Sequence, residues 1–213
     1  MNTLDKLWAS TDSPLEYLQG YARYVAKLLD QWDVKTIETI VGLLEQACRR
    51  GGTIFCVGNG GSASTASHFA TDLAWGRKSS GQRPKVISLA ANVPILTAVA
   101  NDAGYPEIFI EQMRGLFRQQ DVLVAISASG NSDNVLRAVR FANEHGGVSI
   151  GLVGFDGGQM RTQCTACLHV DTKPGDYEAV EDVHHAVCHV VASAVRRRLA
   201  GARPAAVPSG ARR

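Results

Sequence analysis

Apolar residues recur every three or four positions over the first quarter of the chain, which is the pattern of amphipathic helices. One such segment covers residues 14–32. A second begins after Asp33, a residue suited to an N-cap, and ends before Gly51. We therefore predict two helices ahead of the rest of the fold.

Beyond Gly52 the pattern changes to short apolar runs separated by helical patterns. Short buried strands that alternate with helices predict a doubly wound parallel sheet, and so an α/β fold. Residues 1–199 form one predicted domain, and residues 200–213, rich in Ala, Pro, Gly and Arg, form a tail that we expect to be disordered. The predicted strands are residues 53–57, 86–89, 122–126, 149–153 and 168–170, and the helices between and after them are residues 63–75, 94–100, 107–116, 133–145 and 180–199.

The composition narrows the class of protein. The 213 residues are 45% apolar and 20% charged, which is typical of a globular domain, and a net charge of +2 gives no reason to expect a nucleic-acid partner. No apolar run is long enough to span a membrane, and the N-terminus lacks a signal-peptide pattern. Five scattered cysteines indicate a reduced, cytoplasmic protein, and we interpret the C-x-x-C pair Cys164 and Cys167 as packing residues beside a strand.

Two loops rich in glycine and serine follow the first and third predicted strands. Their sequences are GNGGSAS at residues 58–64 and SASGNS at residues 127–132. Ligands bind at the carboxyl ends of strands in open parallel sheets, and glycine lets backbone N–H groups at a helix N-terminus approach an anion. Serine hydroxyls add neutral donors, so we predict a phosphate site. Its candidate residues are Asn59, Gly60, Ser62, Ser127, Ala128, Ser129 and Ser132.

Other nucleotide-binding motifs fit these loops less well. Neither loop contains the lysine of a P-loop. Gly58, Gly60 and Ala63 fit the dinucleotide fingerprint, but the second predicted strand runs into Ala-Ala-Asn with no carboxylate for a ribose. Loops that only cap helices remain an alternative.

Polar residues gather on two predicted helices. His68 and Asp72 are four residues apart, which places them on one helix face. Asn101-Asp102 is either a turn or a substrate contact. Imidazole and carboxylate groups bind divalent metals and also transfer protons near neutral pH. The histidines and carboxylates of the two helices could therefore serve as metal ligands or as acid–base groups. The last helix carries Glu178, Glu181, Asp182, His184, His185 and His189.

The order of these motifs resembles the sedoheptulose-7-phosphate isomerases, the phosphoheptose isomerase branch of the SIS proteins. The matching motifs are GNGGSA at residues 58–63, His68-Phe69-Ala70, Asn101-Asp102, SASGNS at residues 127–132, and Glu181-Asp182 with His184 and His189. The resemblance runs from the N-terminal helices to about Arg198, nearly the whole chain.

The resemblance implies a three-layer SIS fold, in which helices flank a five-stranded parallel sheet, and a homotetramer with active sites between subunits. It implies that serine loops hold a sugar phosphate and that Asn101, Asp102 and Glu178 contact it. It also implies one zinc ion per subunit, held by an H-x3-E pair and a later Q-x7-H pair. Those four positions are His68, Asp72, Glu181 and His189 in this sequence.

Two residues depart from the family pattern: Asp72 stands in place of Glu, and Glu181 in place of Gln. We expect an aldose–ketose isomerase in which Asp72 or Glu181 removes a proton beside the carbonyl and His189 moves a proton between oxygens. A different sugar phosphate is one alternative. A non-catalytic adaptor, resembling the SIS protein that binds the replication initiator DnaA, is another.

Overall fold

The computed structural model describes residues 1–75 and 83–201. Five parallel strands form one sheet in the order β2-β1-β3-β4-β5, which confirms the predicted sheet. From residue 202 on, the tail predicted at residues 200–213 lies outside the described residues. The strands are β1 (Thr53–Gly58), β2 (Lys85–Ser88), β3 (Val122–Ser127), β4 (Val148–Val153) and β5 (Ala166–His169).

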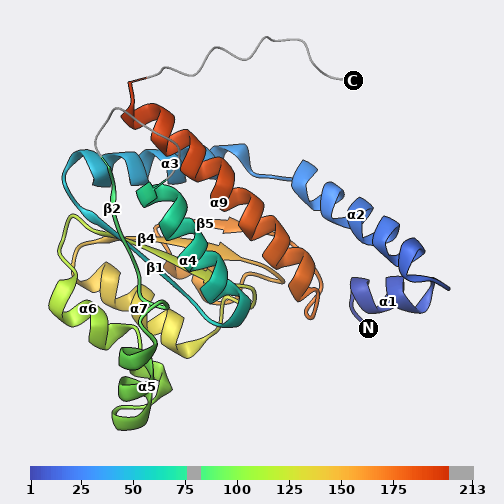
Figure 1. The fold of residues 1–213 in the computed structure, drawn as a ribbon, viewed down its shortest axis with the longest axis horizontal. Helices are drawn as coiled ribbons and strands as arrows, with labels where there is room; N and C mark the ends of the chain where they lie inside the picture. Colours follow the sequence, from blue (N-terminus) through green and yellow to red (C-terminus); the bar gives the residue numbers. More distant parts are fainter. Residues whose placement is uncertain (76–82, 202–213) are drawn as a thin grey trace.

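Helices cover both faces of this sheet, as a doubly wound fold requires (Figure 1). One face carries α3 (Val34–Arg49), α4 (Gly60–Trp75) and α9 (Tyr177–Leu199). The other carries α5 (Val93–Asp102), α6 (Ile110–Leu116), α7 (Asp133–Glu144) and α8 (Met160–Gln163). The helix predicted over residues 107–116 is divided between a 3₁₀ turn, Tyr105–Glu107, and α6.

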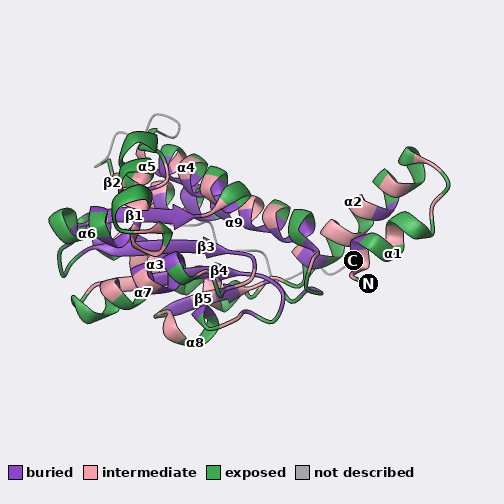
Figure 2. Cartoon of the chain, turned by 90° about the horizontal axis from the view of Figure 1, so that it is seen from below, coloured by how far each residue is buried: buried purple, intermediate pink, exposed green. Residues whose placement is uncertain are grey.

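Successive side chains of the strands divide between two hydrophobic cores. In β1, Ile54 and Cys56 pack beneath α3, α4 and α9, whereas Phe55 and Val57 pack against the helices of the opposite face. All four side chains are buried, which agrees with the alternation of a strand covered on both sides. The central strands accordingly appear buried along their length (Figure 2).

The N-terminal segment stands apart from the three layers. The helix α2 (Pro14–Asp30) extends away from the body, with the short α1 (Thr3–Ala9) folded against it (Figure 2). The hydroxyl of Tyr21 donates to Asp182 at 2.6 Å, and the hydroxyl of Tyr24 donates to Asp176 at 2.9 Å. These bonds tie α2 to the N-terminal end of α9. None of the described helices is long and apolar enough to cross a membrane.

Candidate active site

The two serine loops meet at the centre of the sheet edge. Strand β1 lies between β2 and β3, so the chain leaves β1 toward one side for β2 and returns on the other side at β3. This reversal of strand order opens a crevice at the carboxyl ends of β1 and β3. Both predicted loops begin at those two strand ends, as Gly58 ends β1 and Ser127 ends β3.

A cavity of about 130 Å³ lies in this crevice. Most of the predicted phosphate residues line it, and it is small and largely polar, as an anion site requires. Gly60 borders a neighbouring, more apolar cavity beside α5 instead. The residues that line the polar cavity are Asn59, Ser62, Ile126, Ser127, Ala128, Ser129, Ser132, Tyr177 and Glu181.

Glycine shapes both loops. Gly60 has φ +52° and Gly130 has φ +62°, a left-handed backbone conformation that residues other than glycine rarely adopt. These turns direct the chain into the N-termini of α4 and α7, whose first N–H groups have no partner within the helix. The hydroxyl of Ser127 accepts from the Gly130 N–H at 3.2 Å and lies 3.4 Å from the Ser132 hydroxyl. The second loop is therefore held closed around its own serines.

Asparagine side chains join the first loop to the second. Asn59 and Asn134 exchange two amide hydrogen bonds of 2.8 and 2.9 Å, and the Asn134 oxygen also accepts from the Val135 N–H. The Tyr105 hydroxyl donates to the Asn59 oxygen at 2.9 Å. Sequence analysis missed Asn134, Tyr105 and Tyr177, because only tertiary packing brings them to the loop and no local motif marks them.

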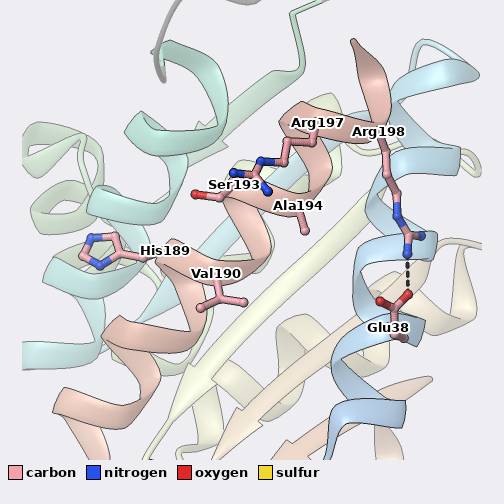
Figure 3. A pocket seen from close by; sticks show the side chains of 7 residues that line it. All are labelled: Glu38, His189, Val190, Ser193, Ala194, Arg197 and Arg198. Atoms are coloured by element: carbon pink, nitrogen blue, oxygen red, sulfur yellow. Dashed lines mark hydrogen bonds and ion pairs between the residues drawn. The ribbon is translucent and has the colours of Figure 1, made fainter. Parts of the chain in front are cut away.

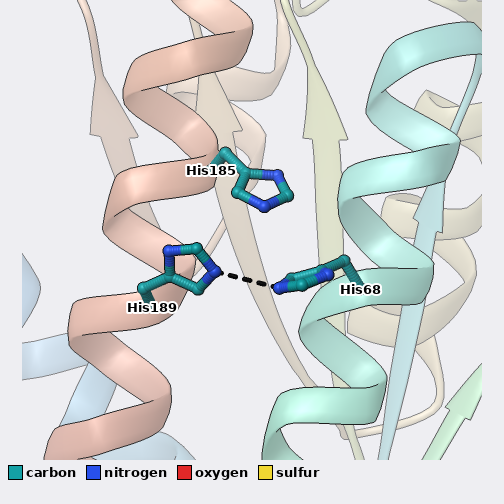
Figure 4. Close-up of side chains that lie close together, drawn as sticks. All are labelled: His68, His185 and His189. Atoms are coloured by element: carbon teal, nitrogen blue, oxygen red, sulfur yellow. Dashed lines mark hydrogen bonds between the residues drawn. The ribbon is translucent and has the colours of Figure 1, made fainter.

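A second polar cluster lies between α4 and α9 (Figure 4). The Nε2 atoms of His68 and His189 are 2.9 Å apart. The Oδ2 atom of Asp72 lies 3.4 Å from Nε2 of His68 and 3.6 Å from Nε2 of His189. The structure thus brings together three of the four residues predicted to bind zinc.

His185 completes this cluster, although sequence analysis gave it no separate role. Its ring lies 4.5 Å from that of His68 and 4.8 Å from that of His189, between centroids. Burial, and then the neighbouring His68 and His189, hold the pKa of His185 below its usual value. Neutral imidazoles bind divalent metals, so the donors present fit the zinc that the family implies.

Glu181 lies apart from the imidazoles. Its carboxylate lines the serine cavity and lies against Gly61, so closely that a methyl group on Gly61 would overlap it. Burial raises the pKa of Glu181, and the charges of Glu178 and Asp182 raise it further. Of the two predicted carboxylates, Asp72 therefore lies with the imidazoles and Glu181 with the serine loops.

The remaining predicted residues occupy the margins. Glu178 is exposed in the first turn of α9. Asn101 and Asp102 end α5 and are bonded to one another at 2.7 Å, outside the residues that line the serine cavity. His184 points into the core, where burial lowers its pKa to about 4.

A larger hollow of about 460 Å³ adjoins the imidazole cluster along α9 (Figure 3). His189 lies at one end, and Arg198 at the other forms an ion pair with Glu38 of α3. Val190 and Ala194 contribute apolar surface between them. The imidazole cluster is therefore accessible at His189 from this hollow along α9.

Comparison with known proteins agrees with this geometry. Residues 16–154 match the SIS domain family. The chain belongs to that family. A phosphoheptose isomerase of Helicobacter pylori strain P12 is 38% identical over 160 residues, which cover 75% of this chain and 82% of the relative. One from Geobacter metallireducens is 32% identical and covers 83% of this chain and 93% of its own length.

Among solved structures, a phosphoheptose isomerase from Neisseria gonorrhoeae has the same fold. Its TM-score is 0.78 at 28% identity, with 86% of this chain and 98% of that chain covered. Within the SIS domain proteins, the chain therefore belongs to the phosphoheptose isomerases, as the motifs of the two loops and the last helix predict.

Proposed function

We propose that the protein is an aldose–ketose isomerase that converts sedoheptulose 7-phosphate to D-glycero-D-manno-heptose 7-phosphate. One observation carries the proposal. A serine-lined cavity of anion size and a cluster of imidazoles with a carboxylate lie along the same pair of helices, α4 and α9. The relatives that carry the name phosphoheptose isomerase support the same reaction.

The phosphate is bound by the serine loops. Ser62 at the start of α4 and Ser129 and Ser132 ahead of α7 supply hydroxyl donors. The N-termini of both helices add backbone N–H groups and the positive ends of their dipoles. Neutral donors suffice here, because the helix termini compensate part of the phosphate charge.

The proton transfers occur at the imidazole cluster. Asp72 takes the proton from C1 of the open-chain ketose, which gives an enediol, and returns a proton to C2. His189 moves a proton between the two oxygens, so that O1 loses a proton and O2 gains one. Asp72 lies 3.6 Å from His189, close enough for both groups to act on one enediol.

The family resemblance implies one zinc ion per subunit at this cluster. His68, His189 and Asp72 would hold it, since their donor atoms lie within 3.6 Å of one another. Bound zinc supplies Lewis acidity, which polarises a carbonyl and stabilises negative charge on the enediolate oxygens.

The family resemblance also supports a cytoplasmic homotetramer. Trp8, Leu15 and Leu18 lie on the projecting α1–α2 segment and are each at least 60% exposed. Exposed apolar surface of this kind is typical of subunit contacts. Light scattering after gel filtration tests this assembly, and a monomeric mass would contradict it.

Turnover of sedoheptulose 7-phosphate by metal-stripped and zinc-restored protein tests the proposal. We expect aldose phosphate only after zinc is restored, and loss of that activity in His189→Gln. An exposed histidine on α7's C-cap, replaced in His145→Ala, serves as the matched control. A folded protein that forms no aldose with zinc present would contradict the proposal and favour another sugar phosphate or the adaptor role.

A further inference from the structure

Three polar side chains form a stripe along α9. Glu181, His185 and His189 follow one another at intervals of four residues, which places them on one helix face in successive turns. Neighbours in this stripe are about 6 Å apart along the axis, whereas Glu181 and His189 are about 12 Å apart. A single ion beside His189 is therefore nearer to His185 than to Glu181.

The facing helix singles out the same two members of the stripe. His68 of α4 contacts both His185 and His189, with ring centroids 4.5 and 5.0 Å apart (Figure 4). One ring nitrogen from each of the three imidazoles lies within 4.8 Å of the others. A bound zinc ion lies about 2 Å from each ligand atom. Three nitrogens this close to one another would need only small side-chain rotations to reach that distance from one ion.

Glu181 is directed elsewhere. Its carboxylate lies over the first turn of α4, against Gly61, and lines the serine cavity. The group of donors that the described residues bring together contains His68, His185 and His189, without Glu181.

We infer that His185 is the third imidazole ligand of the metal and occupies the place that the family pattern gives to the residue at position 181. The site then consists of the imidazoles of His68, His185 and His189 together with the carboxylate of Asp72, which lies beside His68 and His189. The family pattern assigns no role to His185. This inference rests on the metal site of the proposed function but does not depend on which sugar is the substrate.

The site assignment leaves Glu181 free of the metal. It becomes a carboxylate of the anion cavity, where it can accept hydrogen bonds from the sugar hydroxyls next to the phosphate. The presence of Glu181 where the family pattern has Gln is then compatible with metal binding, because the residue at position 181 is not needed to hold the ion.

Competition titration of Zn²⁺ between the full-length, metal-stripped chain and a chromophoric chelator tests this inference without any sugar. We expect His185→Ala to lower the affinity for Zn²⁺ by at least about tenfold, since even outer contacts of metal sites contribute that much. Glu181→Ala, which removes any ligand at position 181, and the control His145→Ala should keep the wild-type affinity. His185→Gln, which retains more of the side chain, replaces His185→Ala if thermal melts show that the latter is unfolded.

Two results would overturn the inference: wild-type affinity in the His185 variant, or an equal loss in Glu181→Ala. Failure of the isomerase proposal is separate. A chain that binds Zn²⁺ through His185 but does not turn over sedoheptulose 7-phosphate would support this site and contradict the substrate. An active enzyme whose affinity for Zn²⁺ is unchanged by His185→Ala would support the substrate and contradict this metal site.

Discussion

Oδ2 of Asp72 lies 3.6 Å from Nε2 of His189, although 117 positions of sequence separate the two residues. The contact exists because α4 and α9 pack side by side over the same face of the sheet. It places a carboxylate and an imidazole side by side, as the proposed proton transfers require.

Asp72→Asn should lower kcat by about 10²- to 10⁴-fold, because the amide cannot accept the C1 proton. Steady-state turnover of the zinc-loaded variant measures this. Asp72 is only partly buried, with 26% of its side chain exposed, so the melting temperature should stay near that of the wild type. Asp30→Asn, at an exposed aspartate that ends α2, is the control. Wild-type kcat in Asp72→Asn would exclude Asp72 as the base.

Gly61→Ala should impair turnover while the fold remains stable. The added methyl group would overlap the Glu181 carboxylate, which is the flexible end of a side chain and can move aside. The displaced carboxylate would then intrude on the serine cavity and raise KM. The matched control is Gly42→Ala in α3, where nothing lies within 4 Å of the new methyl group. It should stabilise the protein by about 0.5–1 kcal/mol. An unchanged KM in Gly61→Ala would show that Glu181 does not border the substrate.

Asn134→Ala should both destabilise the protein and weaken substrate binding. Asn134 is buried and exchanges two hydrogen bonds with Asn59, so its removal leaves a polar group unsatisfied, at about 1–3 kcal/mol. Urea unfolding and KM report the two effects. Asn143→Ala, which loses bonds to Ser149 and Gln163 far from the loops, should reduce stability and leave KM unchanged. If Asn134→Ala and Asn143→Ala had the same KM, Asn134 would not be required to position the first loop for substrate binding.

The N-cap of α3 predicts a pH dependence. Hydrogen bonds to Asp33 from the Thr36 hydroxyl and N–H, and from the Lys35 N–H, hold the pKa of this carboxyl below its usual value. A lowered pKa in the folded state gives stability that is present above the unfolded pKa and is lost as the pH falls through the folded value. Carboxyl groups titrate roughly between pH 6 and pH 2.5. Over this range the melting temperature should fall less steeply in Asp33→Asn than in the wild type. Parallel curves would contradict this assignment.

Gly151→Ala should destabilise the chain by about 1–3 kcal/mol through overpacking. The new methyl group would lie 2.9 Å from the sulfurs of both Cys164 and Cys167, which pack against the core on the α5–α8 face of the sheet. Cys164→Ala combined with Gly151→Ala should recover part of the loss, and the double-mutant cycle measures the coupling. Additive losses would show that the sulfurs do not restrict position 151.

The sheet and its ligand-binding edge follow from sequence because local pattern determines them. All five strands coincide with apolar runs, and the loops after β1 and β3 carry the serines that line the cavity and the glycines that form the turns. The short helices α1 and α8 were missed, since four to seven residues give too little periodicity to detect.

The partners within the site depend on tertiary contacts that no local pattern contains. Asn134 and Tyr105 meet Asn59 only in the folded chain. The position of His185 did have a signal, since it lies one turn before His189 and one turn after Glu181. Spacing alone could not separate it from its neighbour His184, which turns into the core and is fully buried.

The helix α9 also sets a length. It carries Glu181 at the anion cavity and His189 eight residues later, about 12 Å along a single uninterrupted helix. A helix of this kind does not shorten to suit a smaller molecule. In the proposed site, a three-carbon phosphate held in the serine loops would leave its carbonyl short of the imidazoles, whereas an extended seven-carbon chain would reach toward them. The spacing of Glu181 and His189 on α9 would thus select substrates by the number of carbons in the sugar.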